Sequence, residues 1–466
     1  MSGAAGAHAV WCGAALRLPT WFLRETCRKD ATRYESPVSR PSPKAVIRKG
    51  ARVSHRSIGV DERMSPAKAF PLGLQHFLSM FGATVLVPLL MGFSPSVSVM
   101  CSGIGTALYL LTTHNKIPSY LGPSFSFIGP VVLASATAGT EGVCSAIAVA
   151  GLIFIVCALV IRAIGTDWIN TLIPTVVMAS IIFVIGCGLS TTAVQEAFLT
   201  DGVASAWPAL VVSGTAFIVV VLCTCFGKRV LNTIPVLVGA AVAYAVACVF
   251  GVVDFSPVRE AAWLGLPDVS LPTFNLQAIL LVSPIALVVV IEHIGHLFVI
   301  GEMTGNNYNS ILWRSVLGDG LATTVAGFLG APPATTFAEN IGVMSVTRVY
   351  STQVFWYAAA TAFLVGGFCP KLGALIGTIP DTVIGGVSIV IFGLIACNAL
   401  KMLVDHRVDM ASMRNLTVFG GPAIIGIGMQ ALGVAIPLGS YNVPGLAVAA
   451  LLGVFLNLVL PKENCS

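Results

Sequence analysis

Six ionisable side chains stand inside long apolar stretches of the 466-residue sequence: His76, Glu292, His293, His296, Asp319 and Glu339. A charged side chain at the centre of a membrane helix costs ~2.5–3.5 kcal/mol on insertion scales. Sequences keep such residues mainly where they bind a solute, carry a proton or satisfy another polar group. Each of the six is therefore a candidate functional residue.

Glu292 and His296 are four residues apart in the segment "EHIGH", so on a helix their side chains share one face. An apolar setting favours the neutral form of a carboxylic acid, which suits a group that takes up and releases a proton. His296 could hold such a carboxylate in one rotamer. His293 lies off that face, and its simplest role is to close a contact with a neighbouring helix.

Glu339 stands beside Asn340 in "PPATTFAENIGV", where a polar, Pro-containing stretch leads into a short apolar segment. A carboxylate at a helix start can simply cap that end. Alternatively it is a substrate ligand that accepts N–H bonds, while exposed backbone amides of the helix start donate to carbonyl oxygens. A flat solute with alternating N–H and C=O groups fits this mixture. An anionic solute does not, because Glu339 would repel it.

Two further residues are candidates for supporting roles. Asp319 lies between two glycines and could couple to the segment of Glu339 or brace it, and His76 lies in the first apolar segment. Glu292, His293 and His296 do not have the spacing of a zinc helix, whose two His residues are four apart with Glu between them. We therefore expect no metal, no catalytic residue and no enzyme activity.

The composition is that of a polytopic membrane protein, with 56% hydrophobic and only 10% charged residues, where soluble chains carry about 25% charged residues. Of 25 Lys and Arg residues, 12 precede Pro66, so the net charge of +5 belongs to the N-terminal tail and does not indicate nucleic-acid binding. We interpret residues 1–60 as a disordered cytoplasmic tail, or as sequence upstream of the native start.

Spans of ~20 apolar residues divide the rest of the chain into fourteen candidate membrane segments. Their ranges are 70–92, 97–113, 124–137, 143–164, 168–189, 206–226, 231–253, 275–300, 311–330, 337–349, 354–376, 381–404, 415–432 and 443–461. The third and the tenth are too short to cross as whole helices. Each follows a polar, Pro-containing lead-in, which predicts a half-helix preceded by extended chain.

Lys and Arg residues between the spans are concentrated on one side of the predicted membrane topology. One set of loops and the C-terminus hold ten of them, whereas the opposite set holds only Arg259 and Lys371. Basic loops face the cytoplasm, and the span count is even, so we expect both termini to be cytoplasmic. This predicts a multi-pass protein of the cytoplasmic membrane.

The sequence also contains an internal repeat. At one constant offset, Gly103 meets Gly318, Gly105 meets Gly320, and the same offset brings Ser124 onto Glu339. Two repeats, residues 61–253 and 254–461, would each hold seven spans, and an odd number forces them into opposite orientations. In secondary transporters with this plan, broken helices at matching positions mark the binding site near the midplane.

Several segments resemble the nucleobase–ascorbate transporter (nucleobase–cation symporter-2) family, and within it the bacterial uracil permeases. They are "SIGVDER", "QHFLSMFGATVLVP", "IPSYLGPSFSF", "EHIGHL" and the complete signature "ENIGVMSVTR". The resemblance implies an all-α polytopic membrane protein with a 7+7 inverted repeat, a core of spans 1–4 and 8–11, and a gate of spans 5–7 and 12–14. It also implies short antiparallel strands before half-helices 3 and 10, a homodimer formed through the gate, and proton-driven uptake.

The same resemblance assigns roles to individual residues. It implies that Glu292 and Glu339 hold the base, that the backbone at Phe125 and Ala338 donates to it, and that His296 orients Glu292. The pocket-lining and supporting residues would be Ala83, Phe337, Ser124 and Asn340. With Asp319 and His296 as helpers, Glu292 would couple transport to protons, and no other cofactor is implied.

The sequence departs from the uracil permeases at two places. Phe337 and Ala338 stand where Tyr and Gly are common, and Phe392 stands where another Tyr is expected. These changes remove hydroxyl groups and leave the acids in place, so they concern selectivity within the class. Glu339 favours a pyrimidine, because purine members tend to carry Gln there. A purine symporter for xanthine or urate is the alternative, and an anion transporter or channel of the same inverted-repeat plan is a third reading.

Overall fold

The computed structural model describes residues 57–165, 167–200, 203–204, 207–227, 231, 234–267, 269–438 and 441–461, and the predicted tail lies outside this part except for its last four residues. The first half contains α1 (Pro66–Met91), α2 (Pro95–Thr112), β1 (Leu121–Pro123), η1 (Phe125–Phe127), α3 (Ile128–Ile164), α4 (Asp167–Leu172), α5 (Thr175–Gly188), α6 (Ser190–Phe198), β2 (Leu199–Thr200), β3 (Val203–Ala204), α7 (Trp207–Phe226) and α8 (Pro235–Val249).

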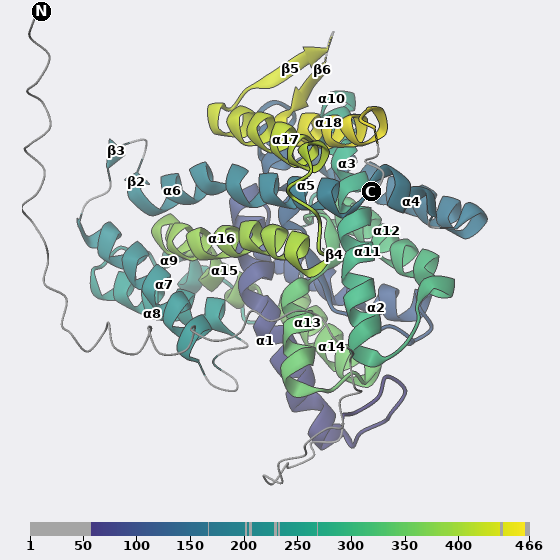
Figure 1. Ribbon diagram of the computed structural model, residues 1–466. Coiled ribbons are helices and arrows are strands. Elements are labelled where there is room, and N and C mark those ends of the chain that lie inside the picture. Colours follow the sequence, from purple (N-terminus) through teal and green to yellow (C-terminus); the bar gives the residue numbers. More distant parts are fainter. Residues whose placement is uncertain are drawn as a thin grey trace, which may run out of the picture. The chain divides into compact units, whose positions relative to one another are not determined.

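The second half contains the remaining elements (Figure 1). They are α9 (Ser256–Glu260), α10 (Leu276–Val282), α11 (Pro284–Thr304), η3 (Asn309–Ile311), α12 (Leu312–Leu329), β4 (Ala334–Thr336), α13 (Ala338–Thr347), α14 (Thr352–Phe368), α15 (Pro370–Gly377), α16 (Asp381–Asp405), α17 (Met413–Leu432), β5 (Ala435–Leu438), β6 (Tyr441–Pro444) and α18 (Gly445–Val459).

Local sequence signals explain where these helices begin and end. Proline occupies the first turn of α1, α2, α8 and α11, where its missing N–H costs no hydrogen bond. Glycines in the left-handed conformation end α1, α11, α12 and α17, since glycine adopts positive φ without steric cost. Proline and glycine in the sequence therefore set where these helices begin and end.

Each of the fourteen predicted ranges overlaps a helix, but three ranges predicted as continuous are interrupted. The fifth breaks between α4 and α5 before Pro174, the eighth breaks at Pro284, and α14 and α15 meet at Pro370 with a bend of 83°. Proline explains these breaks, because it lacks the N–H that continues a helix. By length and composition, the described residues form eight helices able to cross a membrane, or nine with the bent pair. A total of fourteen spans stays a prediction.

The predicted half-helices and strands are present. Helix α13 has ten residues, and the first part of α3 ends at Gly139, whose φ of 66° interrupts the helical conformation. Strands β1 and β4 precede these half-helices and pair antiparallel, as predicted, with Leu121 opposite Thr336. The offset between these two residues is the one that relates Gly103 to Gly318, so the pairing supports a local twofold axis. The full 7+7 repeat stays a prediction.

A threonine fixes each of the two strands. The hydroxyl of Thr106 accepts the N–H of Leu121 at 2.9 Å, and the hydroxyl of Thr323 accepts the N–H of Ala334 at 3.1 Å. Gly122 lies against the ring of Phe337, and a Cβ there would collide with it. These contacts fix the position of the strands from which both half-helices start.

The helices form two groups by their contacts. Helices α1, α2, α3, α12 and α14 pack mainly on one another. Helices α5 to α8 pack with α16, and α5 also packs on α17 and α18. The predicted division into core and gate follows this grouping and stays a prediction.

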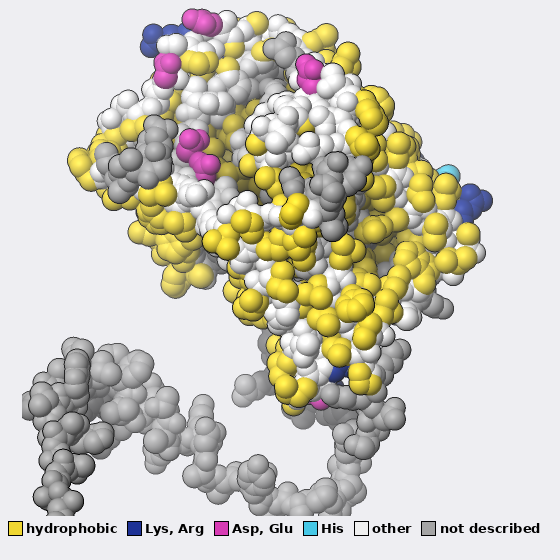
Figure 2. Space-filling model, turned by 90° about the horizontal axis from the view of Figure 1, so that it is seen from above, with side chains coloured by type: hydrophobic (Ala, Val, Ile, Leu, Met, Phe, Trp, Pro, Cys, Tyr) yellow, Lys and Arg dark blue, Asp and Glu magenta, His cyan; other side chains and the backbone are white. Residues whose placement is uncertain are grey.

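The described surface is rich in exposed apolar side chains. Val249 is 85% exposed, Leu432 is 77% exposed and Phe226 is 76% exposed. Figure 2 shows one face on which apolar side chains cover much of the surface and charged side chains are few. Such a surface is suited to lipid and not to water.

Candidate functional site

Three aromatic rings meet where the two half-helices begin. The ring of Phe125, at the start of η1, lies 6.5 Å from that of Phe337 and 6.3 Å from that of Phe392, edge-to-face in both cases. Phe337 directly precedes α13, and Phe392 comes from α16. The structure therefore brings together three residues that are distant in the sequence and that the sequence analysis had each singled out.

The two predicted substrate carboxylates lie at this place. Glu292 of α11 accepts a hydrogen bond from the hydroxyl of Ser126 at 3.0 Å. Glu339 is in the first turn of α13, and its charge is close enough to interact with that of Glu292. Glu339 is exposed and Glu292 half-buried, whereas Phe337 and Asn340 are buried, so both carboxylates keep some solvent contact.

Unpaired backbone donors accompany these acceptors. Phe125 and Ala338 are the first residues of η1 and α13, and the first N–H groups of a helix have no acceptor within it. Helix N-termini also carry a partial positive charge. The site thus combines carboxylate acceptors, amide donors and aromatic walls.

His296 has a different partner from the one that the resemblance implies. Its Nδ1 lies 3.1 Å from the hydroxyl of Thr336, the last residue of β4. Among the hydrogen bonds of the described residues, Glu292 is held by Ser126, and none joins it to His296. His296 is therefore coupled to the strand that precedes α13.

The supporting residues hold the half-helices against their neighbours. The Nδ1 of His76 donates to the Oδ1 of Asn340 at 2.5 Å and so joins α1 to α13. The backbone N–H of Ser124 donates to the carbonyl of Pro333 at 2.8 Å, which extends the strand pairing. Ala83 is buried in α1, and this helix packs against β1, α3 and α13.

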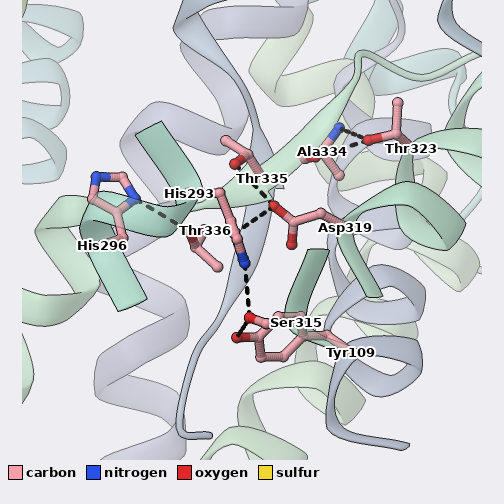
Figure 3. Close-up of polar contacts among 9 residues, drawn as sticks. All are labelled: Tyr109, His293, His296, Ser315, Asp319, Thr323, Ala334, Thr335 and Thr336. Carbon is pink, nitrogen blue, oxygen red and sulfur yellow. Dashed lines mark hydrogen bonds and ion pairs between the residues drawn. The ribbon is translucent and has the colours of Figure 1, made fainter. Parts of the chain in front are cut away.

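His293 and Asp319 form a buried hydrogen-bonded pair beside the site (Figure 3). The Nδ1 of His293 lies 2.8 Å from the Oδ2 of Asp319, and both side chains are at most 3% exposed. The same carboxylate oxygen accepts from the hydroxyl of Thr335 at 3.1 Å. The helix-to-helix contact predicted for His293 therefore includes the predicted residue Asp319, and β4 is attached to both.

Sequence reasoning did not identify four polar residues of this region: Ser126, Thr336, Ser315 and Tyr109. Two of them, Ser126 and Thr336, lie beside residues that were singled out, in "PSFSF" and "TTFAEN". Their position directly beside the start of a predicted half-helix was the sequence signal that could have identified them. Ser315 and Tyr109 carry no such signal, because Ser and Tyr are unremarkable in helices of this composition.

No group of three or more His, Cys, Asp or Glu side chains within the described ranges is arranged to hold a metal ion. The two histidines of this segment share the hydroxyl of Thr336, and one carboxylate, Asp319, contacts His293.

Solved structures with a similar fold include a bicarbonate transporter and the anion transporter Slc26a9. The overall structure of SLC26A9 has a TM-score of 0.64 at 12% identity and covers 84% of this chain and 65% of that one. The transmembrane domain of the cyanobacterial bicarbonate transporter BicA has a TM-score of 0.58 at 14% identity, covering 85% and 99%. At such identities the likeness concerns the fold.

The relatives that are similar in sequence include uracil permeases. The uracil permease of Bacillus subtilis is 40% identical over 422 residues, which covers 88% of this chain and 96% of the relative. The uracil permease of Escherichia coli K12 is 38% identical over 411 residues, covering 87% and 94%. Residues 67–435 match the profile described as "Permease family". With apolar helices throughout and this match over most of its length, the chain is a multi-pass membrane protein that belongs to the permease family of the uracil permeases.

Proposed function

We propose that this protein is a secondary transporter that takes up uracil, or a closely related pyrimidine base, together with protons across the cytoplasmic membrane. The observation that carries the proposal is the position of Glu339 in the first turn of α13, beside Glu292 and the three phenylalanine rings. Carboxylates supply the acceptors and half-helix N–H groups supply the donors for one flat, neutral solute.

The chemistry of a pyrimidine base matches this arrangement. Its ring has two N–H donors and two carbonyl acceptors in one plane, so it can donate to carboxylates while accepting from backbone amides. Aromatic rings pack favourably against such a planar group. The missing hydroxyls at Phe337 and Phe392 remove polar contacts at the walls and leave the edge-on recognition by Glu339 and Glu292 in place.

The sequence relatives favour a base over an anion. Permease relatives indicate a transporter and not an enzyme, and the curated ones at 38–40% identity are uracil permeases. The anion transporters share the fold at 11–14% identity, and this supports no statement about the substrate. Two neighbouring carboxylates would also repel an anion.

Proton coupling is the second part of the proposal. Glu292 is half-buried, lies near another carboxylate and has one hydrogen bond donor, Ser126. When Glu292 binds a proton, the repulsion between the two acids disappears. A proton on Glu292 would then remove one of the two negative charges while the base is bound, and release of one would favour release of the other.

A competition experiment tests the substrate. Purified protein in liposomes with an acidic outside would take up radiolabelled uracil while unlabelled solutes are added in excess. We expect unlabelled uracil to compete strongly, and xanthine, urate, sulfate and bicarbonate to compete weakly. Stronger competition by xanthine or urate would move the protein to the purine group, and competition by an inorganic anion would remove the base-transport proposal.

A further inference from the structure

A continuous line of polar contacts leaves the candidate site through β4 (Figure 3). The hydroxyl of Thr336 lies 3.1 Å from Nδ1 of His296 and 3.2 Å from Nδ1 of His293. His293 in turn lies 2.8 Å from Asp319. One hydroxyl therefore stands between two histidines of the same helix, and the second histidine leads to a carboxylate.

The far end of this line is buried and sets the ring of His293. Nε2 of His293 is 2.7 Å from the hydroxyl of Ser315, which is 2.6 Å from that of Tyr109. If Tyr109 donates to Ser315 and Ser315 donates to Nε2, then Nδ1 carries the ring hydrogen and donates to Asp319. The other oxygen of this carboxylate, Oδ1, is buried without a hydrogen-bond partner among the described residues.

Burial differs between the two ends of the line. His293 and Asp319 are each 2% exposed, whereas His296 is half-buried. The other titratable groups whose charges act on this line are Glu292 on the same helix, Tyr109 on α2 and Tyr308 before η3. Glu339 on α13 acts through Glu292. The line thus runs from a site that a solute can reach to a pair that it cannot.

We propose that Thr336 relays a proton between His296 and the His293–Asp319 pair, which makes that pair a second proton-holding site of the transport cycle. This inference rests on the proposed proton-coupled function and names a route for it. His293 is then a relay group, in addition to closing a contact between α11 and α12.

The transfer balances in three linked steps. The Nδ1–H proton of His293 moves to Oδ2 of Asp319, the hydroxyl proton of Thr336 moves to the vacated Nδ1, and the Thr336 oxygen takes the Nδ1–H proton of protonated His296. Three bonds to hydrogen break and three form. A charged His296 and a charged Asp319 both become neutral, and reversal of the steps returns the proton to the site.

Substitutions of threonine test this route with matched controls. Thr336→Val keeps the shape and removes the hydroxyl, Thr336→Ser keeps the hydroxyl, and Thr323→Val removes a hydroxyl that only fixes β4 to α12. A positioned side chain that transfers a proton typically raises the rate of that step about 100-fold or more. We therefore expect Thr336→Val to lower gradient-driven uracil accumulation at least about tenfold with unchanged uracil binding at fixed pH, and Thr336→Ser to accumulate normally. Thr323→Val loosens β4 without removing the Thr336 hydroxyl, so any accumulation that it loses should match its loss of uracil binding.

The outcomes separate this inference from the proposed function. If the unaltered protein in liposomes fails to accumulate uracil under a proton gradient, the proposed function fails. If it accumulates uracil and Thr336→Val does so equally well, the relay is overturned. Equal loss in Thr323→Val and Thr336→Val, or loss of binding in Thr336→Val, also overturns the relay, because the hydroxyl would then only position the strand.

Discussion

At the scale of single residues, the site contains two carboxylates with different surroundings. Glu339 is exposed at a helix N-terminus, and Glu292 is half-buried and held by Ser126. The first setting keeps an acceptor ready for a solute, because the N-terminal end of a helix favours negative charge. The second setting limits solvation and suits a group that exchanges a proton. The two acids should therefore respond differently to the same substitution.

We predict that Glu339→Gln weakens uracil binding about tenfold or more. The amide replaces an acceptor by a donor, and a hydrogen bond left unmade beneath the bound base costs ~1–3 kcal/mol.

Glu292→Gln keeps the shape but cannot release a proton, so it should abolish proton-driven accumulation while its remaining binding depends less on pH. Binding in detergent across a pH series and uptake into liposomes measure both. Accumulation by Glu292→Gln against a uracil gradient would assign coupling to another group.

At the scale of elements, the half-helices depend on the chain segments that hold their ends. Residues 57–65 lie along the segment that follows α13, and the N–H of Ile58 donates to the carbonyl of Arg348 at 3.0 Å. Arg348 has a φ of 55°, which ends α13 in the left-handed conformation. The amide of Gln353 exchanges two hydrogen bonds with the backbone of Met64. The "SIGVDER" segment therefore fastens the end of the signature helix.

Two truncations test this role. Removal of residues 1–56 should leave uracil uptake intact, because these residues contain no predicted span, motif or repeat partner. Removal of residues 1–65 should lower thermal stability and uptake, since each lost hydrogen bond contributes ~0.5–1.5 kcal/mol net. Melting temperatures in detergent and uptake per inserted protein compare the two. Similar behaviour of both truncated proteins would show that the contacts of Ile58 with Arg348 and of Met64 with Gln353 are dispensable.

At the scale of the whole described chain, two groups of helices meet at the site. Glu292, Glu339 and Phe125 lie on α11, α13 and η1, which contact helices of the first group, and α16 of the second group supplies Phe392. A site between two bodies can open to either side when one body moves against the other, as in alternating access. Phe392 would then leave and rejoin Phe125 during transport.

Membrane orientation is the prediction at this scale. An even number of spans with basic loops on one side predicts that a reporter active only in the cytoplasm is active when fused after Ser466. The same reporter placed in the loop around Arg259, which belongs to the opposite set of loops, should be inactive and serves as the control. Activity at Arg259 together with silence at Ser466 would reverse the predicted orientation, and equal activity at both sites would contradict the predicted inverted repeat.

The sequence by itself determined the family and the membrane character, and it singled out the two acids. These follow from local signals: apolar length marks helices, proline and glycine mark their ends, and "ENIGVMSVTR" is a contiguous motif. The antiparallel strands were implied by the family resemblance, and the structure supplied their register, with Leu121 opposite Thr336.

Only the tertiary structure decided which polar groups are partners. The sequence spacing of Glu292 and His296 suggested a direct contact, but Thr336 from a strand 40 residues away takes the bond of His296. Ser126 and Glu292 are 166 residues apart, and Tyr109 and Ser315 are 206 apart. A hydrogen bond depends on distances within about 3 Å, and these are set by how close glycine-rich helices such as α3 and α12 approach each other, which no local pattern specifies.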